Sequence, residues 1–360
     1  MAGLDRISDG KERLVTTKAR RQQSGVEGYA KEFHNIFQET ASISKNLVRR
    51  ELPQNESHIW DLISLALTHQ ECSEYPYIFK YSFLNVKCDG SHVANLAAGI
   101  HLLQSSTFVF DDILDASKLR YHRPTVNHKY GQGYALVAGL LMQTVGLKAI
   151  NFDLASGRLP NSRDVFRLIG EAMRDCCLGE HLDLRNSGNA TLSIRNYYRM
   201  IRLTSGQFFA RIAKCGALLA NKSDTCVSSL GKFGHNYGMG VQIIDDIIDI
   251  EASPYLTGKA FATDLKCRRM RLPLIYALRL ATGRDADFLR DFLIGPKPTR
   301  GAVYQAARVI KDCGALQACK SVARRYIRKS VLCLSSATPM VSRQRLTWLS
   351  RCILESAILK

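Results

Sequence analysis

The sequence predicts an all-α protein. Apolar residues recur every three to four positions along most of the chain, as at Ile36, Ile43 and Leu47, which is the spacing of one helix face. We find no segment of useful length in which apolar and polar residues alternate as in a half-buried strand. With 360 residues, 46% of them hydrophobic, the chain is long enough to enclose a deep core and an internal cavity. We therefore expect core helices packed around a pocket.

The expected helices are separated by Gly and Pro breaks. Residues 1–27 are polar and basic, and we expect them to form a disordered arm. Residues 28–360 are expected to form a single all-α domain, because no flexible linker divides the periodic segments. The most regular helices are expected at 93–115, 137–154, 165–177, 197–219, 230–250, 272–282, 302–313, 316–336 and 343–359.

Composition excludes several classes of protein. The net charge is +18, but the basic residues are scattered and no zinc-finger or RNA-binding signature accompanies them, so we expect no nucleic acid partner. The most apolar stretch, 135–150, contains Gln143 and Lys148, so we expect no membrane span. The 11 cysteines include no Cys-x-x-Cys pair, and no signal peptide is evident. We therefore expect reduced thiols and a cytoplasmic location.

Two copies of an acidic motif, Asp-Asp-x-x-Asp, stand at 111–115 and 245–249, each directly after an apolar run. The first and fifth residues of such a motif lie on one helix face, one turn apart. A single copy is as often a solvated helix end, but two copies inside apolar runs argue for a shared role. Carboxylates held so close repel one another unless a cation joins them, and Mg²⁺ prefers oxygen ligands. Two such clusters across a cavity would clamp a diphosphate through bridging metals.

A basic loop follows each acidic motif. Arg120 and Arg123 follow the first, and Lys259, Arg269 and Arg271 follow the second. A diphosphate leaving group needs this combination, because metal ions and Lys or Arg neutralise the charge that develops as the C–O bond breaks.

With these motifs the chain resembles the trans-isoprenyl diphosphate synthase (polyprenyl synthetase) family from about residue 62 to the C-terminus. The resemblance also rests on the segments 119–125, 179–184, 237–246, 258–265 and 272–274. It implies an isoprenoid-synthase-type helical barrel around a deep apolar pocket, with the acidic motifs at its mouth. It further implies that an allylic diphosphate is ionised with three Mg²⁺ and attacked by a π-bond, commonly in a homodimer.

The resemblance also implies roles for individual residues. Two Mg²⁺ would be bound by Asp111, Asp112 and Asp115. The third would be bound by Asp245, supported by Asp246 and Asp249. The allylic diphosphate would be held by Arg120, Lys259 and Arg269. The acceptor and the pocket would be contacted by Gln104, Thr107, Thr204 and Gln242, although Gln104 is equally well explained as a satisfied core amide.

The chain departs from the family where the second substrate binds. The family usually has Gly-Gly-Lys-x-x-Arg-Pro before the first acidic motif, to hold the diphosphate of isopentenyl diphosphate, whereas residues 70–76 here read Gln-Glu-Cys-Ser-Glu-Tyr-Pro. The usual double Arg is Arg120-Tyr121, the usual Lys-Thr is Thr204-Ser205, and Glu180 stands where Gln is usual. Each lost cation removes a charge-assisted hydrogen bond that contributes about 1.5–3 kcal/mol. We therefore expect a second diphosphate to bind poorly.

These observations favour a Mg²⁺-dependent prenyltransferase with an altered acceptor. In the family, small residues a turn above the first motif permit tails longer than C10. Ser106 and Thr107 are small there, although Phe108 and Phe110 are not, so we expect a C15–C20 donor, farnesyl or geranylgeranyl diphosphate. The expected acceptor is a small molecule other than isopentenyl diphosphate, for example indole-3-glycerol phosphate, as in the indole-diterpene prenyltransferase branch of the family. Three alternatives stay open: a terpene cyclase, a chain-elongating polyprenyl diphosphate synthase, and an inactive regulatory subunit. The six intact aspartates argue against the last.

Overall fold

Helices make up almost all of the regular structure. The computed structural model describes residues 25–53, 55–68, 74–84, 93–251, 261–356 and 359. Its elements are α2 (Gly25–Glu51), α3 (Ser57–Thr68), α4 (Glu74–Phe83), α5 (Ala94–Leu114), β1 (Leu119–Arg120), β2 (Arg123–Pro124), α6 (Val126–Tyr130), α7 (Gln132–Leu154), α8 (Ser162–Arg185), α9 (Ile194–Ile201), the π-helix η3 (Arg202–Gly206), α10 (Gln207–Leu219), α11 (Asp224–Glu251), α13 (Thr263–Lys266), α14 (Leu272–Leu280), α15 (Gly283–Ile294), α16 (Arg300–Asp312), α17 (Ala315–Leu332) and α18 (Met340–Leu354). The predicted all-α class is confirmed.

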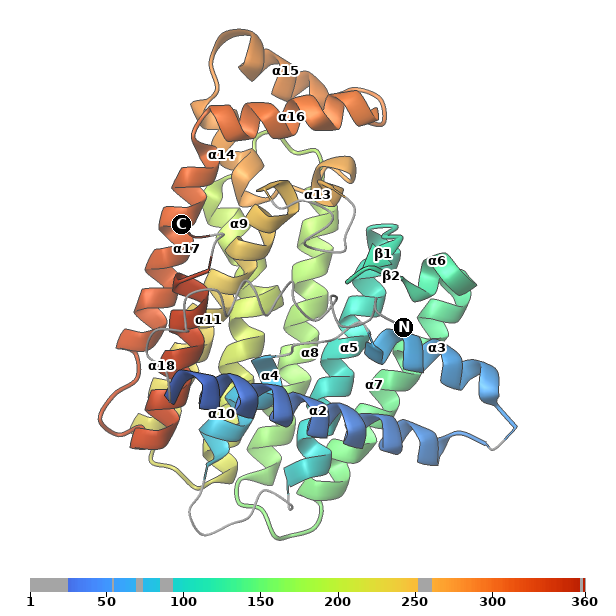
Figure 1. Ribbon diagram of the computed structural model, residues 1–360, viewed down its shortest axis with the longest axis vertical. Helices are drawn as coiled ribbons and strands as arrows, with labels where there is room; N and C mark the ends of the chain where they lie inside the picture. Colours follow the sequence, from blue (N-terminus) through green and yellow to red (C-terminus); the bar gives the residue numbers. More distant parts are fainter. Residues whose placement is uncertain are drawn as a thin grey trace.

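The long helices α5, α7, α8, α11 and α17 run roughly along the long axis of the molecule, and α2 crosses them (Figure 1). The helices α15 and α16 form a separate tier at one end, above α14 (Figure 1). The two-residue strands β1 and β2 pair antiparallel where the chain leaves α5. Their turn places Tyr121 and His122 at positive φ, as a two-residue hairpin of the primed type requires.

Close backbone contact joins α5 to α7. A Cβ atom added to Gly99 would lie 2.6 Å from the carbonyl oxygen of Gly146, and one added to Gly146 would lie 2.9 Å from that of Gly99. Because both residues lack a side chain, the two helices approach closely enough to bury Leu102, Ala138 and Met142 in one apolar cluster. This contact fixes the helix that carries the first acidic motif.

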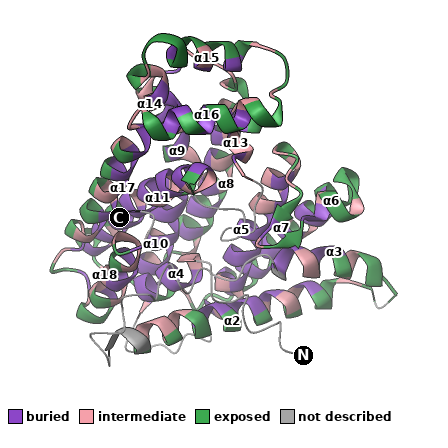
Figure 2. Ribbon diagram, turned by 45° about the horizontal axis from the view of Figure 1, so that its top comes forward, coloured by how far each residue is buried: buried purple, intermediate pink, exposed green. Residues whose placement is uncertain are grey.

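The interior on the other side of the molecule is aromatic as well as aliphatic. Tyr77, Tyr197, Phe233 and Tyr237 are fully buried in a large core that joins α4, α9, α10 and α11 to α14–α18. Figure 2 shows these inward faces buried and the outward faces exposed. This core fixes α11, the helix that carries the second acidic motif, against α17.

The structure corrects three expected helix bounds. The helix expected at 165–177 spans Ser162–Arg185, and Gly179 within it packs closely on η3, because an added Cβ there would lie 2.4 Å from the Thr204 side chain. The helix expected at 197–219 contains the π-turn η3. The helix α15 lies where no helix was expected. The expected arm, residues 1–27, lies outside the described residues up to residue 24, and α2 begins at Gly25.

One described helix, α7, is long and apolar enough to cross a membrane by length and composition alone. Its inner residues pack on α5, so 44% of the tested window is buried. Its outer face exposes Tyr134, Val137, Leu140 and Phe152, the last at 71% exposure. Core helices of globular proteins pass the same test, so the composition alone does not indicate a span.

Candidate active site

A cavity of about 80 Å³ lies at the ends of α5 and α11, the helices that carry the two acidic motifs. Its walls come from α5, α8, α9, η3 and α11 and from the residue preceding α14. The lining residues are Asp111, Leu114, Asp115, Glu180, Asp183, Met200, Ile201, Thr204, Gln242 and Arg271. Four carboxylates from two helices therefore share one small space. The first acidic motif and Gln242, which lies one turn before the second motif, meet there.

The pKa values of Glu180 and Asp183 reflect burial and the repulsion between neighbouring carboxylates. Burial, followed by the negative charges of Asp111 and Asp183, raises the pKa of Glu180 to about 8. Burial also raises the pKa of Asp183, although two arginines oppose the rise. A cation placed among these groups would remove the repulsion.

The oxygen-only donor set fits a hard divalent cation. No three Asp, Glu, His or Cys side chains in the described part of the chain converge into a preformed metal cage. Mg²⁺ is commonly held by one or two carboxylates together with water and substrate phosphate oxygens, so a preformed cage is not required. The residues present therefore fit a divalent cation that binds together with an anionic substrate.

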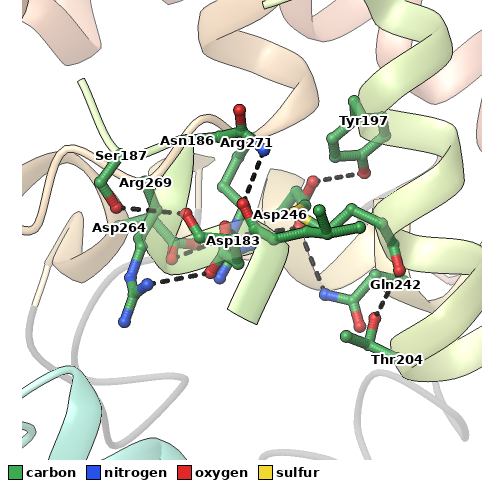
Figure 3. Close-up of polar contacts among 12 residues, drawn as sticks. Asp183, Asn186, Ser187, Tyr197, Thr204, Gln242, Asp246, Asp264, Arg269 and Arg271 are labelled. Carbon is green, nitrogen blue, oxygen red and sulfur yellow. Dashed lines mark hydrogen bonds and ion pairs between the residues drawn. The ribbon is translucent and has the colours of Figure 1, made fainter. Parts of the chain in front are cut away.

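The second acidic motif is organised differently from the first. Asp246 is 1% exposed, and its Oδ2 accepts hydrogen bonds from the Tyr197 hydroxyl at 2.5 Å and the Leu272 amide at 3.3 Å (Figure 3). Burial raises its pKa to about 7. Asp249 accepts the backbone N–H groups of Thr263 and Asp264 at 3.0 and 3.1 Å, and so caps α13. Asp245 is the exposed member of the triad.

Two of the three basic residues predicted to bind the diphosphate, Arg120 and Arg269, contact aspartates of the first acidic motif. Arg120 contacts both carboxylate oxygens of Asp112, with nitrogen–oxygen distances of 2.9–3.1 Å. Arg269, 2% exposed, bonds Asp115 at 2.7 Å and lies 3.2 Å from Asp183 (Figure 3). Without a bound anion, each guanidinium is therefore paired with a carboxylate. The third predicted cation, Lys259, lies outside the described residues.

Arg271 also lines the cavity, although the resemblance assigned it no role. Its guanidinium lies 2.9 Å from Asp183, 3.0 Å from Asp264 and 3.9 Å from Asp246 (Figure 3). Burial lowers the pKa of Arg271, but the charges of Asp264 and Asp183 outweigh it and raise this pKa well above its usual range. Arg271 thus joins α8 to the second acidic motif. The basic residues in the segment 268–271 were the sequence feature that could have drawn attention to Arg271.

The predicted acceptor and pocket residues separate into two groups. Thr204 and Gln242 line the cavity, where Gln242 accepts a hydrogen bond from Ser205 at 2.7 Å and donates to Asp246 at 3.4 Å. Gln104 is buried on α5, and Thr107 donates to its backbone oxygen at 2.7 Å. These two residues lie along α5 on the N-terminal side of Asp111 and do not line the cavity.

The resemblance predicts that Tyr75 takes the place of the Arg in the Gly-Gly-Lys-x-x-Arg-Pro motif. Its ring stacks on Phe209, with centroids 4.2 Å apart and planes inclined by 17°, and meets Phe208 edge-on at 5.0 Å. Burial raises the pKa of Tyr75 well above its usual range, and the charges of Glu74, Asp245 and Asp111 add to the rise. The ring is therefore within electrostatic reach of one carboxylate from each acidic motif. Residues 70–73, the rest of the altered segment, lie outside the described residues.

Comparison with known proteins identifies the family. The family profile described as polyprenyl synthetase matches residues 77–310. The chain belongs to the polyprenyl synthetase family. The members of this family are prenyltransferases, and the resemblance found from the motifs is confirmed.

Several curated members of the polyprenyl synthetase family are similar over most of their length. The chain is 30% identical to the geranylfarnesyl diphosphate synthase of Aeropyrum pernix over 236 residues, which are 65% of this chain and 73% of that protein. It is 25% identical to the geranylgeranyl diphosphate synthase of Mycobacterium tuberculosis over 67% of this chain and 68% of that protein. It is 26% identical to the octaprenyl diphosphate synthase of Escherichia coli over 68% of this chain and 74% of that protein.

Solved structures of family members share the fold. A polyprenyl synthase from Caulobacter crescentus, crystallised with calcium and isoprenyl diphosphate, superposes with a TM-score of 0.79 at 20% identity, over 92% of this chain and 98% of that one. Geranylgeranyl pyrophosphate synthetase from Pyrococcus horikoshii gives a TM-score of 0.76 at 23% identity, over 90% of this chain and 98% of that one. The helical barrel of this chain is therefore the fold of the family.

Proposed function

We propose that this polyprenyl synthetase ionises a C15–C20 allylic diphosphate with Mg²⁺ and transfers the prenyl chain to a small acceptor that carries no diphosphate. An indole such as indole-3-glycerol phosphate has the required chemistry. The observation that carries the proposal is the stacking of Tyr75 on Phe209, at the position where the resemblance predicts an Arg.

The donor side retains the groups that a diphosphate leaving group needs. Three Mg²⁺ would be held by Asp111, Asp112, Asp115 and Asp245, and when bound they neutralise the diphosphate oxygens. Arg120 and Arg269 are paired with Asp112 and Asp115. As cations take over these carboxylates, both guanidinium groups become able to donate to the diphosphate. In this proposal, the ion pairs of Arg120 and Arg269 with aspartates are replaced by contacts of both arginines with the diphosphate.

The acceptor side favours a flat apolar molecule. Tyr75, Phe208 and Phe209 supply an aromatic wall, and planar rings pack on such a wall in offset-stacked or edge-on contacts. An aromatic carbon beside the donor would attack the allylic cation and then lose its proton. Glu74, which begins α4 next to Tyr75, adds negative charge that disfavours a second diphosphate.

Small side chains on α5 support the long donor. Ser106 is fully buried and donates to the Leu103 oxygen at 2.7 Å, and Thr107 follows it one turn before Asp111. Neither side chain extends far from the helix, and the proposal places an apolar tail longer than C10 beside them. Farnesyl and geranylgeranyl diphosphate satisfy this requirement.

Chain elongation is the second candidate, and the relatives favour it. The three curated relatives described above are all named as synthases of longer prenyl diphosphates. In that case isopentenyl diphosphate is the acceptor, and Lys or Arg residues outside the segment 70–76 hold its diphosphate.

A homodimer in the cytoplasm is part of the same proposal. The outer faces of α7 and α8 expose Leu136, Val137, Leu140, Phe166 and Leu178, an apolar surface that a second copy would cover. Sedimentation equilibrium at micromolar concentration tests the dimer. A measured mass of 40.3 kDa, that of the monomer, would contradict it. Cell fractionation tests the location.

Product analysis by mass spectrometry tests the proposed reaction. The full-length protein is incubated with Mg²⁺ and farnesyl or geranylgeranyl diphosphate, and then with no acceptor, isopentenyl diphosphate or indole-3-glycerol phosphate. We expect a prenylated indole. A longer diphosphate would instead show chain elongation, and a hydrocarbon from the donor alone would show a cyclase. A complete absence of products in all three incubations would support a regulatory subunit.

A further inference from the structure

The C-terminal part of the chain carries a one-sided charge. Between residues 313 and 354 the sequence contains no Asp or Glu but has eight Lys and Arg. Two of them are neutralised by distant acids: Lys320 lies 2.8 Å from Glu251 and Arg345 lies 2.6 Å from Glu32. The excess positive charge therefore falls on the remaining basic residues of this segment, most of which lie on α17.

A row of these residues follows one exposed face of α17. Arg324, Arg325, Arg328 and Lys329 line an open groove of about 670 Å³ together with Ser321 and Leu332. Across the parts of the chain that the structure describes, none of the four has a carboxylate within salt-bridge distance. Because like charges in one row repel each other, this arrangement costs stability unless an anionic partner approaches it. We call this row and Leu332 the α17 face.

Basic residues of neighbouring elements extend the α17 face. Burial lowers the pKa of His235 of α11, and the nearby charges of Arg202 of η3 and Lys329 of α17 lower it further. The ring of Tyr198 of α9 meets Tyr326 of α17 edge-on at 6.1 Å, and the charge of Arg325 opposes the rise that burial causes in the Tyr198 pKa. Arg202 and Lys329 therefore both lie near His235. In Figure 1, α17 forms the edge of the bundle opposite α7.

The α17 face ends in exposed apolar side chains. Leu332, its last residue, is 83% exposed, and Met340 and Val341, which begin α18, are 63% and 44% exposed. The connection between the two helices is held in place, because the Ser229 hydroxyl donates to the Cys333 oxygen at 2.6 Å and accepts from the Ser335 amide at 3.0 Å. The apolar tip is therefore a fixed part of the surface.

A basic row that ends in exposed apolar side chains is the composition of a segment that lies on an anionic membrane. Anionic headgroups attract the Lys and Arg side chains, and residues such as Leu332 enter the boundary with the acyl chains. A nucleic acid would satisfy the charges but would give the apolar tip no role. The pattern of charge and exposure therefore favours lipid.

We propose that the α17 face docks the protein on an anionic lipid surface. The protein sits on the membrane and does not cross it. The proposal does not depend on the identity of the acceptor. It fits an enzyme that handles prenyl chains, because a long prenyl chain partitions into a bilayer.

Vesicle sedimentation with the full-length protein tests this docking. One set of vesicles contains phosphatidylcholine alone, and the other contains phosphatidylcholine with phosphatidylserine. The test variant carries R325E, R328E and K329E, and a second carries L332S. The matched control carries R284E, K297E and R308E, three exposed basic residues of the α15–α16 tier with the same total change of charge. Circular dichroism and donor turnover in solution show that each variant is folded.

We expect the parent protein and the control to bind the anionic vesicles and to leave the neutral ones in solution. The α17 triple variant should lose about a hundredfold in affinity or more, because each basic residue near such a surface contributes substantially. L332S should bind severalfold more weakly. Equal binding to neutral and anionic vesicles would overturn the proposal and point to the apolar α7 surface. Equal losses in both triple variants, or tighter binding to duplex DNA than to vesicles, would overturn it as well.

Discussion

The ring of Tyr75 stacks on the ring of Phe209 at a centroid distance of 4.2 Å. The resemblance predicts an arginine at the position of Tyr75, and Phe209 lies on α10 just beyond the π-turn η3, so the contact brings α4 against α10. We propose that this apolar contact takes the place of a cation that would hold a second diphosphate, while the donor motifs are kept.

Restoring the cation should restore binding of isopentenyl diphosphate. In Y75R the new guanidinium would lie near the metal-binding carboxylates and would supply one charge-assisted hydrogen bond to phosphate, about 1.5–3 kcal/mol. We expect the KM for isopentenyl diphosphate to fall about tenfold or more, and prenylation of the indole to weaken. Steady-state kinetics measure both. Y75F is the control, because it keeps the stacked ring. An unchanged KM in Y75R would refute the assignment of this position.

The ion pair between Arg120 and Asp112 predicts how metal and stability are linked. In R120Q the buried Asp112 loses its partner, so the free energy of unfolding should fall by about 3 kcal/mol. Mg²⁺ with the donor diphosphate should raise the melting temperature of R120Q more than that of the parent, because the cation replaces the lost charge. Thermal denaturation with and without these ligands measures the difference. The double variant R120Q/D112N should be less destabilised than the two single effects combined. Simple additivity would show that the pair is unimportant.

Donor length should respond to residue 107. A phenylalanine at this position projects from α5 one turn before Asp111 and fills space used by the donor tail. We expect T107F to prefer a shorter donor, with kcat/KM for geranylgeranyl diphosphate reduced about tenfold relative to that for geranyl diphosphate. T107S is the matched control and should behave like the parent. The same preference in T107F and T107S would place the tail elsewhere.

His101 predicts acid sensitivity away from the active site. It is fully buried with Nδ1 2.9 Å from the Ser44 hydroxyl, and burial, aided by the charge of Lys45, lowers its pKa from 6.5 to about 4. Between pH 6.5 and about 4, His101 takes up a proton in the unfolded chain but not in the folded protein. Stability due to the neutral ring is therefore complete above pH 6.5 and is lost as the pH falls to 4, by about 3 kcal/mol. Urea unfolding from pH 4 to 7 measures this loss, and H101Q should show a weaker slope. An equal slope in H101Q would assign the acid sensitivity to other groups.

The all-α fold and the two acidic motifs could be predicted from the sequence because both depend on residues close together in the chain. Apolar periodicity located α5 and α11, and the motifs at their ends needed no tertiary information. The contacts of Arg271 could not be predicted, because Asp183 lies on α8 and Asp246 on α11, both far from Arg271 in the sequence. The stacking of Tyr75 on Phe209 likewise joins residues far apart in the sequence. The close packing of Gly179 against Thr204 could not be predicted either, because it is a tertiary contact.

The release of inorganic diphosphate from geranylgeranyl diphosphate tests most directly whether the acidic motifs activate an allylic donor. The rate is measured with Mg²⁺ and a panel of acceptors, for the parent protein, D111N and D245N. We predict release that stops when Mg²⁺ is chelated and that falls about a hundredfold or more in either variant. Release that is equally fast in the parent and both variants, or no release with any acceptor, would contradict the account.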